Sequence, residues 1–247
     1  MRSFLRLVLA VAFVSTLSIP GRAHAAQLAS GMGGPAGFGV NFLDYNDDSS
    51  SGSIDLRPAF PQGLRLWGRT FTTAYVNNNG NMTFGAPVGQ YTPTPFPIAD
   101  QAMIAPFWAD VDTRGGGRPG RNGVWWDLRP GQMTVTWHNV GYYGSHNDRE
   151  NSFQLIIRGG QAEDDGVFVV EFRYNRCEWT TGDASGGHGG MGGNPGQAGF
   201  DGGNRRDYLV LPGSRTRHVL ELCRRSNVGE PGVFRFSVVN GRPRAAH

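Results

Sequence analysis

The sequence predicts an all-β fold, an antiparallel β-sandwich with long Gly- and Asp-rich loops. Apolar and polar residues alternate over several short segments, which places one face of each strand on a core and the other toward solvent. Clusters of Gly, Pro, Asn and Asp separate these segments, as is typical of short antiparallel strands. No stretch combines capping residues with a long amphipathic period, so we expect no extended helix.

The strands follow from the alternation, taken in chain order. Apolar residues recur at every second position in residues 133–137, 153–157, 168–172 and 234–238. Before them, Asn79-Gly80 predicts a hairpin turn between strands at 71–76 and 82–84, with a positive φ at both turn residues.

Two segments are predicted to be irregular loops. Residues 44–53 are rich in Asp, Ser and Asn, and residues 182–203 are rich in Gly. Glycine-rich chain is costly to order, so we expect the second segment to form a long loop. Loops of this kind often carry the binding residues of a sandwich.

An export signal is predicted at the N-terminus. Two arginines lie among the first six residues, an apolar run covers residues 7–19, and Ala-His-Ala at 23–25 has the small-x-small pattern of a signal peptidase site. The apolar run is shorter than the roughly 20 residues of a membrane-spanning helix. We therefore expect a signal peptide at residues 1–25 and a secreted or extracytoplasmic protein with no membrane span.

The charge balance argues against a nucleic-acid partner. The whole chain has 23 basic and 20 acidic residues, a net charge of +3. Three arginines belong to the predicted leader, so residues 26–247 have no net charge, whereas nucleic-acid binders usually show a concentrated basic face. The length of this part fits a single β domain.

The two cysteines, Cys177 and Cys223, are predicted to form a disulfide, because an exported chain meets an oxidising compartment. A metal or redox pair is the alternative, but the CxxC spacing that those chemistries prefer is absent.

Several strings in a fixed order resemble a known family. They are YVNNNGNMTFG (75–85), IAPFWADVDTR (104–114), VTWHNVGYY (135–143), NSFQLII (151–157) and WTTGDASGG (179–187). Together they resemble the nidogen-like (NIDO) extracellular domain family, found in nidogen, alpha-tectorin and exported bacterial proteins, most strongly over residues 71–201. The resemblance implies an extracellular β domain linked to cell–matrix adhesion and no catalytic activity. We therefore expect a non-catalytic module that binds an extracellular matrix or cell-surface protein or glycan.

A calcium site is predicted in the loop DYNDDSSSGSID. Asp44, Asn46 and Asp48 stand at positions 1, 3 and 5 of a calcium loop, and Asp55 stands at position 12. Ser49 occupies the place of the usual turn glycine, so a solvated acidic turn is the alternative interpretation. If calcium binds, a calcium-dependent, lectin-like glycan binder becomes the alternative function.

A second pair of acids, Asp110 and Asp112, alternates onto one face of its segment. These carboxylates could hold a cation or accept hydrogen bonds from backbone N–H groups. Trp137 and Trp179 are expected to be packing residues, and Pro106 is expected at the start of a strand.

A secreted hydrolase is a third hypothesis. The segment GDASGG at 182–187 resembles the GDSGG of trypsin-like proteases, but Ala184 interrupts the match. Ser185, His146 and Asp148 could be combined into a triad, since a triad is defined by geometry and not by order. A zinc site is also conceivable, although the spacing of the histidines does not match a zinc motif. Those histidines are His138, His146, His188 and His218.

Overall fold

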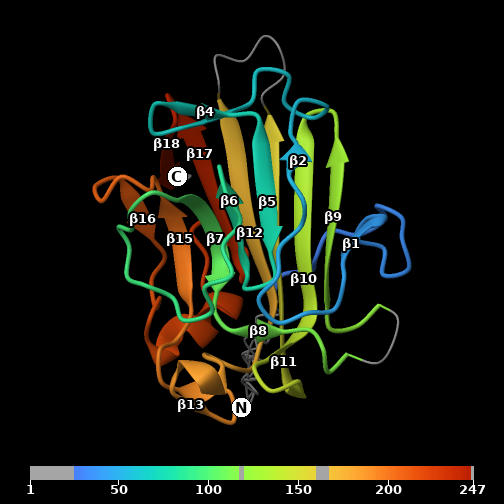
Figure 1. The fold of residues 1–247 in the computed structure, drawn as a ribbon. Helices are drawn as coiled ribbons and strands as arrows, with labels where there is room; N and C mark the ends of the chain where they lie inside the picture. Colours follow the sequence, from blue (N-terminus) through green and yellow to red (C-terminus); the bar gives the residue numbers. More distant parts are fainter. Residues whose placement is uncertain (1–24, 117–119, 160–166, 246–247) are drawn as a thin grey trace, which may run out of the picture.

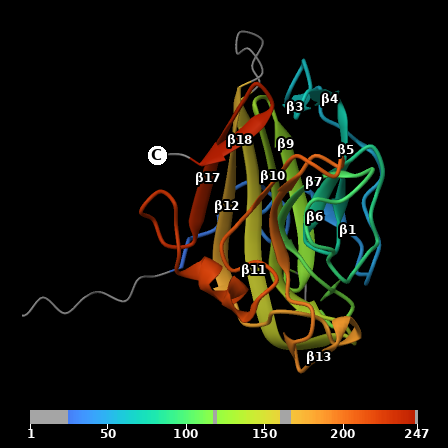
Figure 2. The same cartoon turned by 90° about the vertical axis from the view of Figure 1, so that its left-hand side faces the viewer.

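Two antiparallel β-sheets lie face to face in a computed structural model of the chain (Figures 1 and 2). The structure describes residues 25–116, 120–159 and 167–245. The predicted leader lies, except for Ala25, outside the described residues. Within these ranges, no helix has the length and apolar character of a membrane span.

The larger sheet forms one layer. In spatial order it contains β1 (Asn41–Leu43), β9 (Gly123–Arg129), β10 (Gln132–Tyr142), β11 (His146–Gly159), β12 (Phe168–Cys177), β17 (Val233–Val239) and β18 (Arg242–Ala245), and β8 (Val111–Asp112) pairs with β10.

The smaller sheet forms the other layer. In spatial order it contains β16 (Tyr208–Val210), β15 (Gln197–Asp201), β7 (Ala102–Trp108), β6 (Asn81–Phe84), β5 (Thr73–Asn77) and β2 (Ile54–Asp55). The remaining elements are short: the pair β3 (Leu64–Leu66) and β4 (Arg69–Phe71), the pair β13 (Gly187–His188) and β14 (Met191–Gly192), and the 3₁₀ helices η1 (Asp183–Ser185) and η2 (Arg217–Cys223).

The segments predicted from the alternation pair side by side in the larger sheet. Val135 on β10 lies opposite Leu155 on β11, Leu155 opposite Phe172 on β12, and Phe172 opposite Phe234 on β17. All four side chains are buried. The prediction of an all-β antiparallel sandwich is confirmed, because every second residue along each of these strands faces the core between the two sheets.

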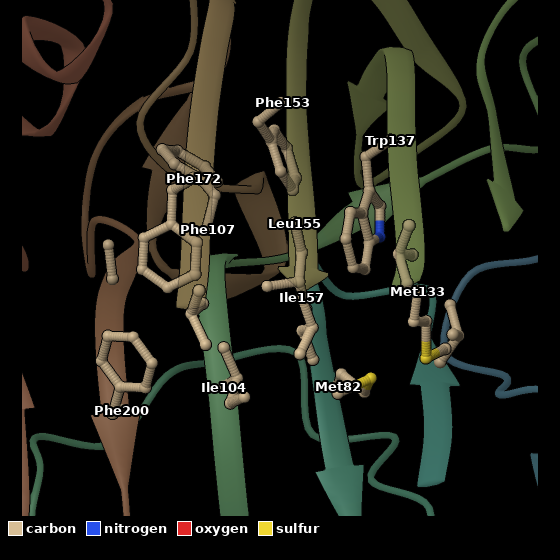
Figure 3. Close-up of a cluster of buried hydrophobic side chains, with 14 of the residues drawn as sticks. Met82, Ile104, Phe107, Met133, Trp137, Phe153, Leu155, Ile157, Phe172 and Phe200 are labelled. Atoms are coloured by element: carbon tan, nitrogen blue, oxygen red, sulfur yellow. The ribbon is translucent and has the colours of Figure 1, made fainter. Parts of the chain in front are cut away.

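The core fills the space between the two layers (Figure 3). Trp137 and Phe153 of the larger sheet stack with ring centroids 5.2 Å apart, and Phe107 of the smaller sheet lies 5.4 Å from Phe153. The Trp179 ring meets Phe107 edge to face at 5.3 Å. Trp137 and Trp179 are both fully buried, so their prediction as packing residues is confirmed.

The prediction of a long irregular loop over 182–203 is wrong in its second half. Residues 197–201 form β15, a fully buried strand between β7 and β16. Ala198 and Phe200 face the core. At Gly199 the φ angle is 146°, and a Cβ atom there would lie 2.0 Å from the carbonyl oxygen of Leu209. Glycine is therefore present because β16 approaches closely, and not because the segment is loose.

Two local expectations also need correction. The hairpin turn contains three residues, 78–80, between the paired Asn77 and Asn81. Only Gly80 in this turn has a positive φ, 75°, as in three-residue hairpin loops. Pro106 lies inside β7 and not at a strand start. The pairing of β7 with β15 is irregular around Pro106, which has no N–H to donate.

The outer face of the larger sheet carries buried polar groups. The chain before β1 covers part of this face, since Ala29 and the Gln154 side chain exchange two hydrogen bonds of 3.0 and 2.9 Å. Nearby, Glu171 accepts from Arg173 at 2.6 Å and from Arg235 at 2.7 Å. Burial opposes ionisation of Glu171, but the bonds from Arg235 and Arg173 outweigh it and hold its pKa below the ordinary value.

The predicted disulfide between Cys177 and Cys223 is present. It joins the end of β12 to the end of η2, across a sequence separation of 46 residues. The bond ties the segment that contains β15 and β16 to the larger sheet.

We predict that Glu171→Gln lowers the free energy of unfolding by about 1–3 kcal/mol at neutral pH, because two charge-assisted hydrogen-bond partners lose their carboxylate. A carboxyl with a lowered folded-state pKa contributes stability above its unfolded pKa and loses it as pH falls. The difference between the two proteins should therefore shrink below pH 4.5, the ordinary glutamate value. Denaturant unfolding at several pH values measures this. Glu230→Gln is the control, because Glu230 is 53% exposed and 3.8 Å from Arg173. A constant difference down to the acid limit would contradict the assignment.

We further predict that the Cys177→Ser/Cys223→Ser double variant loses about 4 kcal/mol of unfolding free energy, the value of the chain-entropy model for this separation. Chemical denaturation with and without reductant measures this loss. The reductant should lower the midpoint of the parent protein and leave the double variant unchanged. Equal midpoints for the oxidised parent and the variant would show that the bond contributes no stability.

Candidate functional site

Three consecutive asparagines, Asn77 to Asn79, lie at the turn between β5 and β6, and all are buried. The Asn77 amide donates to the Asn81 side chain at 2.7 Å and to Thr83 at 3.0 Å. A buried amide is costly unless its donors and acceptor find partners. The turn therefore depends on the hydrogen bonds that its buried amide side chains make.

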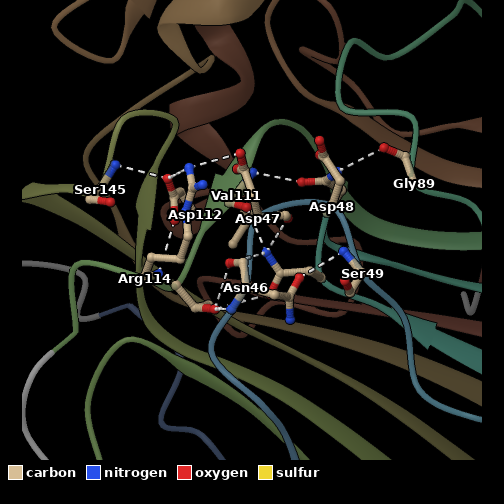
Figure 4. Close-up of polar contacts among 12 residues, drawn as sticks. Asn46, Asp47, Asp48, Ser49, Gly89, Val111, Asp112, Arg114 and Ser145 are labelled. Atoms are coloured by element: carbon tan, nitrogen blue, oxygen red, sulfur yellow. Dashed lines mark hydrogen bonds and ion pairs between the residues drawn. The ribbon is translucent and has the colours of Figure 1, made fainter.

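Asn78 and Asn79 bind two other segments to this turn. The Asn78 amide donates to the carbonyl oxygens of Asp47 and Val111, both at 2.6 Å. Asn79 accepts from the backbone N–H of Val111 at 2.9 Å and donates to Asp48 Oδ1 at 2.8 Å. The loop before β2 and the segment that leads into β8 are thus held side by side (Figure 4).

Asp112 is a fully paired buried carboxylate (Figure 4). It accepts from the Arg114 guanidinium at 2.6 Å and from the Ser145 backbone N–H at 2.8 Å. Burial raises the pKa of Asp112, but the hydrogen bonds from Arg114 and Ser145 outweigh burial and lower it. Arg114 also reaches Asp47 Oδ2 at 2.8 Å. Of the two interpretations of the Asp110–Asp112 pair, acceptance of backbone N–H groups holds for Asp112.

Asp110 is different, although it is 1% exposed. Neither of its carboxylate oxygens accepts a hydrogen bond from a described residue, and both are out of contact with solvent. Gly182 packs directly against it, since a Cβ atom at Gly182 would lie 2.3 Å from Asp110 Oδ2. A side chain at residue 182 would collide with the carboxylate, so glycine is required there.

Burial raises the pKa of Asp110 to about 7, and neighbouring negative charges add to the effect. These charges belong to Asp47, Asp48, Asp112 and Asp183. Burial also raises the pKa of Asp47, to about 6, against the opposing charge of Arg114. The end of the sandwich that holds these carboxylates therefore has an excess of negative charge.

Asp47, Asp48 and Asp110 are the group best suited to hold a metal ion among the described residues. Each offers a carboxylate oxygen, and these oxygens lie within 4.8 Å of one another. Oxygen-only ligands suit hard cations such as calcium and magnesium.

The predicted calcium loop is brought together only in part. Asp48 belongs to the carboxylate group above. Asp55 instead pairs with Arg57 at 2.8 Å on the surface. Asn46 bonds within its own turn, donating to the Asp44 carbonyl at 2.6 Å and accepting from Ser49 N–H at 2.7 Å. Calcium binding by Asp44, Asn46, Asp48 and Asp55, and the lectin hypothesis that rests on it, remain predictions.

Each residue of the hypothetical catalytic triad contacts a side chain outside the triad. Ser185 Oγ lies 2.7 Å from Thr92 Oγ1. Asp148 accepts from the Tyr142 hydroxyl at 2.9 Å, and the His146 ring stacks on Tyr142 at 4.9 Å. The contacts of Ser185 therefore give the proposed triad no support.

The four histidines lie against different partners. His138 faces the Gly120 carbonyl at 3.0 Å, and His218 pairs with Glu221 at 2.7 Å. His146 stacks on Tyr142, and His188 is exposed on β13. This arrangement gives no support to a zinc site.

A polar depression of about 560 Å³ lies near the carboxylates. Charged and amide side chains line it, among them Arg121, Asn147, Glu150 and Arg176. Gly115 at its edge packs against Ser145, which bonds to Asp112. The depression and the carboxylate group therefore share one end of the sandwich.

The sequence alone does not predict Asp47, Asn78 and Asn79 as site residues. Asn79 was interpreted only as a turn residue, yet the turn needs one residue with positive φ, and Gly80 provides it. The turn does not need three consecutive asparagines. The additional amide side chains are the feature of the sequence that could have indicated a buried polar network.

Comparison with known proteins matches residues 72–122 and 130–240 to the nidogen-like domain. Alpha-tectorin of Mus musculus is 37% identical over 217 residues, which cover 78% of this chain and 10% of that protein. Nidogen of Drosophila melanogaster is 29% identical over 226 residues, covering 78% of this chain and 16% of that protein. The chain thus spans a small part of these relatives. No solved structure gives a significant match.

We predict that Asn78→Ala lowers the free energy of unfolding by about 2 kcal/mol or more, because the buried carbonyl group of Val111 and the partly buried one of Asp47 lose their donor. Thermal or denaturant unfolding measures the change. Asn41→Ala is the control, since Asn41 makes one exposed hydrogen bond to the Trp126 carbonyl, and its loss should cost within about 0.5 kcal/mol. Equal effects of the two substitutions would contradict the role given to Asn78.

Proposed function

The chain belongs to the nidogen-like domain family, and we propose that it works as a non-catalytic interaction module of the extracellular matrix or cell surface. The family match over most of the described residues is the observation that carries this proposal. The resemblance implies an extracellular β domain linked to cell–matrix adhesion. The predicted leader would deliver such a domain to that location.

The proposal treats residues 26–247 as one domain behind a cleaved signal peptide. One core cluster supports this view, since it includes residues from Leu43 to Val238 and draws on both sheets. The disulfide between Cys177 and Cys223 supports export, because such bonds persist in oxidising compartments.

We place the partner on the polar depression at the end of the sandwich. Arg121 and Arg176 on its wall are 50% and 37% exposed, and Glu150 lies between them in ion-pair contact with both. Charged side chains of both signs, together with the amide side chain of Asn147, suit a polar partner, such as a matrix protein or a cell-surface glycan. Loops at the end of a sandwich commonly carry such contacts.

We predict that the purified protein binds selected matrix proteins or surface polysaccharides in a saturable way. Biolayer interferometry against a panel of both classes measures this. Arg121→Glu reverses a charge on the depression and should weaken binding several-fold without loss of thermal stability.

Arg206→Glu is the matched control for this experiment. Arg206 is exposed beyond the other end of β15, so its charge reversal should leave binding unchanged. Failure to bind any member of the panel would remove the interaction proposal. Equal weakening by both substitutions would remove the depression as the binding surface.

A further inference from the structure

We propose that Asp47, Asp48 and Asp110 form a calcium-binding site at the end of the sandwich. The three carboxylates come from two segments, the loop before β2 and the residues between β7 and β8. The proposal does not rest on what the domain binds, and it differs from a linear calcium loop that ends at Asp55.

The spacing of the oxygens fits one ion. Carboxylate oxygens of all three residues lie within 4.8 Å of one another. Calcium binds oxygen at about 2.4 Å, so two ligands on opposite sides of the ion are separated by up to about 4.8 Å. A single ion placed among the three residues can therefore contact each of them.

The carboxylate of Asp110 supplies a second, independent observation. The residue is 1% exposed, and neither of its oxygens has a hydrogen-bond partner among the described residues. Asp47 Oδ1 is likewise buried without a partner. Buried polar atoms in folded proteins almost always have partners, so three such oxygens in one cluster point to a ligand that the protein side chains do not provide.

The guanidinium group of Arg114 does not supply the missing partner of Asp110. Arg114 gives its hydrogen bonds to Asp112 and to Asp47 Oδ2. Asp112 is therefore neutralised by an arginine of the protein, whereas no described arginine pairs with Asp110. Asp110 and Asp112 thus have different environments. Asp112 is paired with an arginine, whereas Asp110 is available to bind an ion.

The site is also positioned and accessible. Asn79 donates to Asp48 Oδ1, and Asn78 donates to the Asp47 carbonyl, so the two loop residues are held beside β8. Asp48 is exposed and Asp47 is partly exposed, which gives an ion a path from solvent to Asp110. A metal site needs both ligand residues that are held in position and an entry path for the ion.

Calcium is the cation that fits best. The group contains only carboxylates, which are hard oxygen ligands, and lacks the histidines or cysteines that transition metals prefer. Calcium accepts irregular coordination by carboxylates and water, whereas magnesium demands nearly octahedral geometry. Calcium sites of extracellular modules have dissociation constants of about 10⁻⁴–10⁻³ M, which match an exported protein.

The test combines isothermal titration with calcium chloride and thermal unfolding of the full chain in chelator, millimolar calcium or millimolar magnesium. We expect one calcium per chain, and a rise of a few degrees in the unfolding temperature that is larger with calcium than with magnesium. Asp110→Asn and Asp48→Asn should each abolish both signals while unfolding cooperatively in chelator. Asp44→Asn and Asp55→Asn are matched controls that should keep both signals.

Each alternative result overturns the proposal. Absence of calcium binding by the parent protein would remove the proposed site. Calcium binding that survives Asp110→Asn would place the ion elsewhere. Loss of binding in Asp44→Asn or Asp55→Asn, with retention in Asp110→Asn, would favour the linear loop. Because Asp48 is exposed, Asp48→Asn keeps the test valid if Asp110→Asn fails to fold.

Discussion

The hydrogen bonds of Asn78 and Asn79 hold together the end of the sandwich where the candidate site lies. Each buried amide must find partners, and each finds them on segments that are distant in sequence, at Asp47, Asp48 and Val111. Satisfying the amides therefore fixes where the two acidic segments meet. This contact between the two segments fixes the position of the carboxylates near Asp110. It also fixes the pairing of Asp112 with Arg114 and the edge of the polar depression.

Much of the fold could be predicted from the sequence because several strands carry apolar residues on the core face and polar residues on the other face. A period of two is visible wherever one face packs on the core, as at Val135, Leu155 and Phe172. The alternation of apolar and polar residues did not predict β15. Gly199 permits the close approach of β16, and the glycine-rich composition of this segment resembles that of a loop. Pro106 was also misplaced, because an irregular pairing accommodates a proline inside β7. Both errors arise from contacts between strands, which local composition does not encode.

Less of the candidate site could be predicted, since it joins segments about sixty residues apart. Spacing within one loop suggested Asp44, Asn46, Asp48 and Asp55, and of these four the structure places only Asp48 with Asp47 and Asp110. The difference between Asp110 and Asp112 is also invisible in the sequence. Both acids alternate in the same string, and only the three-dimensional position of Arg114 shows which one is paired. The disulfide was predictable because the sequence contains just two cysteines.

The oxygens of Asp110 and Asp47 that lack partners among the described residues are assigned here to a bound calcium ion. A crystal structure of the protein grown in millimolar calcium, with anomalous differences measured at long wavelength, tests this assignment. We predict one anomalous peak about 2.3–2.6 Å from oxygens of Asp47, Asp48 and Asp110. Absence of a peak there, with Asp110 hydrogen-bonded to another carboxyl or to water, would contradict the account.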